Sequence, residues 1–104
     1  MTKNELLQNA LLELREASLS IHSKSSDWHE TMDKYNMLFL GEKFNKISSI
    51  ELTRTLNNYF SMDITGEELI QILPETCKLL NIYFEALVSA ENHTKLTGYY
   101  IMLH

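Results

Sequence analysis

Only a few side chains in this sequence are of a type and spacing that could do chemistry. His29 and Asp33 are four positions apart, so one helix face could offer them to a metal ion as two ligands. Two ligands on a surface helix more often form a solvated pair, and we expect no metal there. Cys77 is the single cysteine and forms no internal disulfide. We expect its thiol to be buried, because a reactive thiolate needs a basic or helix-start environment.

The remaining candidates for chemistry have simpler interpretations. No nucleophile–histidine–acid order, glycine-rich phosphate loop, metalloprotease motif or zinc-type cysteine spacing occurs. Glu67 and Glu68 are adjacent, but negative charge is favourable at a helix start. The aromatic pairs at 83–84 and 99–100 could stack on nucleic-acid bases, although a hairpin should turn one ring of each pair into the core. We therefore expect no enzyme, no cofactor and no metal site.

A repeated signal marks two helices that would position these residues. Ser48 and Thr65, seventeen positions apart, can each cap a helix, and a glutamate follows each of them three positions later. Apolar pairs bracket both starts: Ile47 with Leu52, and Ile64 with Leu69. The pattern predicts helices over 48–60 and 65–80, joined by a tight turn. Pro74 should kink the second helix or force it to restart.

The flanking segments complete the predicted element order. Residues 4–22 have the apolar spacing of an amphipathic helix. A second helix should begin near Trp28 and stop at Gly41, and its core face should carry Trp28, Met32, Tyr35 and Phe39. β-forming residues at 82–88 and 98–103, divided by a polar stretch, predict a hairpin with a long loop. The expected fold class is mainly α with a C-terminal β-hairpin, preceded by an N-terminal amphipathic helix.

Length and composition limit the classes of protein that this chain can represent. Its 104 residues suit a single domain, with residues 1–23 as the N-terminal helix and 27–104 as the core. Fourteen acidic residues against nine lysines and arginines give a net charge of −5. This balance disfavours a domain built mainly to grip a phosphate backbone. We find no signal peptide and no bilayer-spanning run, and we expect a cytoplasmic protein without a membrane partner.

The element order from Trp28 onward resembles the winged helix-turn-helix superfamily. The resemblance makes 48–60 the second helix, 65–80 the recognition helix, 44–47 a small first strand and 89–97 the tip of the wing. It implies a DNA-binding regulator. The same stretch is also similar to an EF-hand module, with 28–39 as the entering helix. The ligand positions of that alternative are lost, since Leu40 replaces the first aspartate and Asn45 the glycine, so no calcium site is expected.

The predicted fold and the net charge are compatible with two functions. The first is a non-enzymatic module that binds a protein partner or itself, such as an adaptor, a regulator or an inhibitor from a phage or mobile element. Its candidate partner-binding residues are Glu67, Glu68, Gln71, Glu75 and Lys78, and its candidate dimer contacts are Leu7, Leu11, Leu14 and Ile21. The alternative is a nucleic-acid-binding regulator, whose candidate contacts are Arg54, Lys78, Asn92, His93, Thr94 and Lys95. Carboxylates on the recognition helix disfavour this alternative, because they would approach phosphates.

Overall fold

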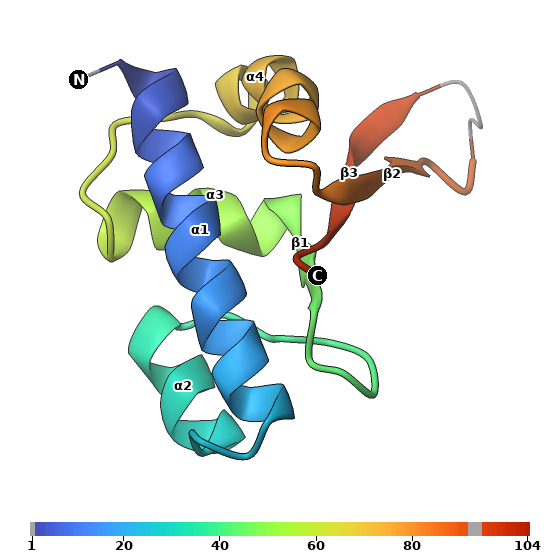
Figure 1. The fold of residues 1–104 in the computed structure, drawn as a ribbon. Helices are drawn as coiled ribbons and strands as arrows, with labels where there is room; N and C mark the ends of the chain where they lie inside the picture. The colour runs from blue at the N-terminus through green and yellow to red at the C-terminus, as the bar shows by residue number, and fades with distance from the viewer. Residues whose placement is uncertain (1, 92–94) are drawn as a thin grey trace.

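A computed structural model describes residues 2–91 and 95–104 of the chain. Within these residues, a short strand separates the first two helices from the next two, and a β-hairpin follows the last helix (Figure 1). The elements are α1 (Lys3–His22), α2 (Trp28–Tyr35), β1 (Lys46–Ser48), α3 (Ser49–Asn58), α4 (Gly66–Leu79), β2 (Tyr83–Val88) and β3 (Leu96–Met102). The predicted class, mainly α with a C-terminal hairpin, is confirmed. None of the described helices is long and apolar enough to cross a membrane.

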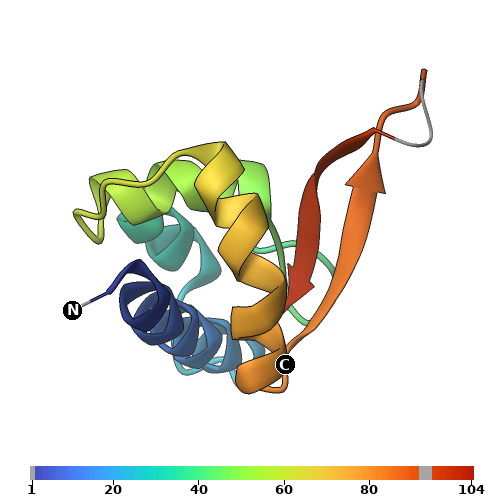
Figure 2. The same ribbon diagram turned by 90° about the horizontal axis from the view of Figure 1, so that it is seen from above.

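The three strands form one antiparallel sheet in the order β1-β3-β2. β3 is the central strand: Ile101 faces Ile47 of β1 on one side and Phe84 of β2 on the other. Ile101 and Ile47 are completely buried, so this row of the sheet anchors the hairpin to the helical core. The hairpin extends away from the helices beyond this point (Figure 2).

The two predicted helix starts are present, but only one is a complete capping box. The Thr65 hydroxyl accepts a hydrogen bond from the Glu68 backbone, and the Glu68 carboxylate accepts one from the Thr65 backbone. Ser48 caps α3 by accepting from the Ile50 backbone N–H at 3.2 Å. Glu51 instead lies 3.8 Å from the guanidinium group of Arg54. Both helices therefore begin where the sequence predicts, one residue after the cap.

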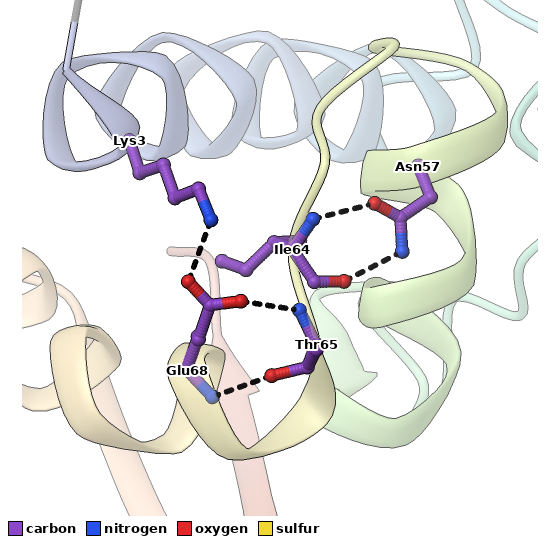
Figure 3. Close-up of polar contacts among 5 residues, drawn as sticks. All are labelled: Lys3, Asn57, Ile64, Thr65 and Glu68. Atoms are coloured by element: carbon purple, nitrogen blue, oxygen red, sulfur yellow. Dashed lines mark hydrogen bonds and ion pairs between the residues drawn. The ribbon is translucent and has the colours of Figure 1, made fainter.

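The turn between α3 and α4 is held by one side chain. The Asn57 carboxamide accepts a hydrogen bond from the Ile64 backbone N–H at 2.9 Å and donates one to the Ile64 carbonyl at 2.8 Å (Figure 3). Ser61 lies inside this turn at a positive φ of 56°. Pro74 lies within α4, which continues to Leu79, so the predicted restart at Pro74 does not occur.

The prediction for α2 was wrong in its end and in one core residue. The helix ends at Tyr35 because Asn36 adopts the left-handed conformation, with φ of 51°. Gly41 also has positive φ, but it belongs to a later turn. Tyr35 and Phe39 are buried as expected, whereas Trp28 is 51% exposed at the start of the helix.

The predicted dimer contact through α1 needs correction as well. Its four candidate side chains are between 0% and 5% exposed, and they belong to the chain's own hydrophobic core: Leu7, Leu11, Leu14 and Ile21. α1 packs against α2 and α4. The apolar stripe of α1 is therefore buried within one copy of the chain and is not exposed for contact with a second copy.

Candidate interaction surface

The exposed face of α4 carries most of the predicted partner-binding residues. Glu67, Gln71, Glu75 and Lys78 are all exposed, and their spacing of three or four positions places them along one side of the helix. The helix buries its opposite side through Leu69, Leu73, Thr76 and Cys77. The structure thus brings four of the five candidates together on one outward row, which is acidic at its N-terminal end.

Glu68 is the exception, because its partly exposed carboxylate forms an ion pair with α1 of the same chain. One of its carboxylate oxygens lies 2.6 Å from the Lys3 ammonium group of α1, and the other accepts from the Thr65 backbone (Figure 3). The hydrogen bond from Lys3 and that from the Thr65 backbone hold the pKa of Glu68 below its ordinary value of 4.5. Glu68 therefore links α4 to α1, and its assignment as a partner-binding residue stays a prediction.

Two exposed apolar side chains follow the acidic row, and sequence reasoning missed them. Leu79, in the last turn of α4, is 66% exposed, and Tyr83, the first residue of β2, is 64% exposed. Asn81, at a φ of 57°, turns the chain between them. A hollow of about 470 Å³ adjoins this corner and is lined by Cys77, Lys78, Asn81, Ile82, Tyr83 and Phe84. The helical phase of α4 carried the only available signal, since it places Leu79 one position after Lys78 on the outward side.

The aromatic pairs are divided between core and surface as predicted. Phe84 and Tyr99 are half-buried against the core and meet edge to face at 5.5 Å between ring centroids. Tyr100 lies on the opposite face of the sheet, where the Lys46 ammonium group is 4.2 Å from its ring centroid. Only Tyr83 of these four rings is strongly exposed, so the described residues do not form a stacking platform of several rings.

The candidate nucleic-acid contacts are distributed over separate elements. Arg54 donates a hydrogen bond to the Asn36 carbonyl at 2.7 Å, which directs its guanidinium group toward the end of α2. Lys78 lies in the last turn of α4, and Lys95 precedes β3; both are exposed. Asn92, His93 and Thr94 lie outside the described residues. The described basic candidates thus come from α3, α4 and the hairpin, and no single element carries them.

The residues considered for chemistry have structural explanations. Burial raises the pKa of the Cys77 thiol to about 11, so the thiol stays protonated at neutral pH. His29 and Asp33 form an exposed pair with 3.6 Å between ring nitrogen and carboxylate oxygen. In the part of the chain that the structure describes, no group of three or more histidine, cysteine or acidic side chains could hold a metal ion.

A second hollow, of about 700 Å³, lies where α1 ends and α2 begins. It is lined by Ile21, His22, Lys24, Ser25, Ser26, Asp27, Trp28, Glu42 and Phe44. The lining mixes cationic, anionic and aromatic groups, and Asp27 is already used as the cap of α2, where it accepts from the His29 backbone. This mixture does not specify one class of ligand.

Comparison of the chain with known protein families, with curated proteins and with solved structures finds no match. We therefore infer the function from the geometry and charge of the exposed residues.

Proposed function

We propose that this protein is a non-enzymatic interaction module with a winged-helix-like fold that binds a protein partner. Its binding site is the α4–β2 surface, which we define as the exposed side chains Glu67, Gln71, Glu75, Lys78, Leu79 and Tyr83. The fold part of the proposal is supported by two features: the succession of α3 and α4 across the connection 59–65, and the pairing of β1 with the central strand of the sheet, β3. The sheet also occupies a segment for which an EF-hand pair has no counterpart.

One observation carries the functional part of the proposal. Leu79 and Tyr83 are each almost two-thirds exposed; Leu79 follows Glu67, Gln71, Glu75 and Lys78 on α4, and Tyr83 begins β2 four positions later. Exposed apolar groups rimmed by charge are typical of protein-binding surfaces, in which an aromatic or aliphatic residue often acts as the anchor. The partner that this surface fits is a basic segment with an apolar side chain that reaches Leu79 and Tyr83.

The charge of the same surface argues against DNA in the position that a recognition helix would occupy. Glu67 and Glu75 are exposed on the side of α4 that would enter a major groove. Carboxylates there would face phosphates on both sides of the groove without compensating counter-ion release. A nucleic-acid-binding role remains the second candidate because the winged-helix-like arrangement and exposed Lys78 and Lys95 favour it.

A displayed random-peptide library selected on the immobilised full chain tests the proposal. We expect the enriched peptides to be basic with an apolar anchor. They should bind the wild type but not a double variant, Leu79→Ser with Tyr83→Ser. The matched control removes two equally exposed apolar side chains elsewhere, Leu38→Ser with Ile50→Ser, which are 52% and 63% exposed. This control should bind like the wild type. Peptides that bind both double variants equally, or that depend only on Leu38 and Ile50, would refute the proposed site.

A further inference from the structure

The two edges of the sheet differ in how they are protected. β1 has three residues, and its outer side is covered by Leu40, which exchanges backbone hydrogen bonds of 2.7 Å and 3.2 Å with Lys46. β2 has six residues and pairs only with β3. Among the described residues, no backbone hydrogen bond joins 83–88 to any other segment. Figure 2 shows the hairpin standing clear of the helices, with β2 on its outer side.

The side chains of β2 do little to block further pairing. Natural edge strands are usually guarded by lysine, proline, inward charge or a bulge. The sequence of β2, Tyr-Phe-Glu-Ala-Leu-Val, contains no proline or glycine and one charge. That charge, on Glu85, lies 3.7 Å from Lys46 of the same sheet and is partly neutralised there. A register shift is present, but it falls between Leu87 and Val88, so Tyr83–Leu87 is a regular open edge.

We propose that β2 pairs with β2 of a second copy of this chain, antiparallel about a twofold axis, to give one continuous sheet. A twofold axis perpendicular to the sheet keeps each residue on the same face in both copies. Because paired residues of antiparallel strands also share a face, the axis must lie midway between two copies of the same residue. An axis at Glu85 would place two carboxylates directly opposite each other, which is unfavourable. An axis at the small Ala86 places Glu85 opposite Leu87 of the partner subunit and avoids that contact. The low charge and high β propensity of the strand favour a second copy as the occupant.

Cysteine cross-linking tests this register, in a Cys77→Ala background that removes the native thiol. Antiparallel partners have Cα atoms about 4.5–5.5 Å apart, within the range of a disulfide. Ala86→Cys should therefore form a covalent dimer on mild oxidation. The matched control is Glu85→Cys, because the Cα atoms of the two copies of residue 85 would be about 8 Å apart and should cross-link poorly. Equal cross-linking of both variants, or none by Ala86→Cys in folded protein, would overturn the proposal.

Light scattering of the unmodified chain provides a second measurement. We expect the mass of a dimer at high protein concentration and the mass of a monomer for Ala86→Lys, which places two like charges opposite each other at the axis. Ala90→Lys makes the same substitution outside β2 and should remain dimeric. A wild-type monomer at all concentrations would contradict the proposal. Selected peptides should still bind monomeric Ala86→Lys, so a failure of the strand pairing and a failure of the α4–β2 surface are distinguishable.

Discussion

The side chain of Asn57 binds both backbone groups of Ile64, seven residues later, as a neighbouring strand would (Figure 3). The contact closes the turn between α3 and α4 and so fixes the angle at which α4 leaves it. Ile64 itself is buried beside the α4 start. The Asn57 amide therefore contributes to the orientation of the α4–β2 surface, together with the Lys3–Glu68 ion pair and the buried side of α4.

Replacing Asn57 by alanine should destabilise the protein by about 1–3 kcal/mol, because two half-buried backbone groups would lose their partners. The free energy of unfolding from urea denaturation measures this loss. Asn58→Ala changes the exposed neighbour and should stay within about 0.5 kcal/mol of the wild type. Equal effects of the two substitutions would show that the Asn57 clamp does not stabilise the turn.

The lowered pKa of Glu68 predicts a pH-dependent contribution to stability. The carboxylate binds its proton less readily in the folded chain than in the unfolded one, so its contribution is complete above the ordinary pKa of 4.5. It should fall as the pH drops below 4.5 through the lowered pKa. Glu68→Gln should therefore be less stable than the wild type at neutral pH and approach it in acid. Denaturation at several pH values measures the difference, and Glu67→Gln, on an exposed neighbour, should give a flatter profile.

Residue 98 has no room for a side chain, because β3 passes very close to the start of α3 there. A Cβ atom at this position would lie 2.7 Å from the Ser49 hydroxyl oxygen, which accepts a hydrogen bond from the Tyr99 backbone. Gly98→Ala should cost about 1–3 kcal/mol of stability by overpacking. Combining it with Ser49→Ala should give less than the sum of the two single losses, since the second change removes the atom in the way. Strict additivity in thermal or urea unfolding would contradict this explanation.

The Cys77 thiol should be unreactive in the folded protein. With a pKa of about 11, roughly one thiol in a thousand is ionised at pH ~8. The side chain is also completely buried. A colorimetric thiol reagent should therefore react slowly with native protein and rapidly once denaturant unfolds it. Fast reaction of native protein would mean that the end of α4 opens readily.

The local helix signals were predictable from the sequence, whereas the helix surfaces were less so. Ser48 and Thr65 cap helices as expected because capping depends on residues within one turn. The predicted end of α2 was wrong. Both Asn36 and Gly41 adopt positive φ, and the sequence does not show that Asn36 already does so and ends the helix first. Trp28 was assigned to the core on spacing alone, but it is the first residue of α2 and is 51% exposed.

The candidate site was partly predictable for a similar reason. The helical period identified Glu67, Gln71, Glu75 and Lys78 as outward, and they are exposed. The contact of Glu68 with Lys3 was not predictable, because Lys3 is 65 positions away in the sequence. Leu79 and Tyr83 were missed because their exposure depends on where α4 ends and β2 begins. Long-range packing, which no local pattern encodes, decided each of these cases.

We propose that the α4–β2 surface binds protein rather than nucleic acid. An anisotropy titration of labelled duplex and single-stranded DNA with the full chain at low salt tests this directly. We expect no saturable binding to either DNA. Saturable binding that weakens steeply with added salt, and that is lost on Lys78→Glu with Lys95→Glu, would contradict it.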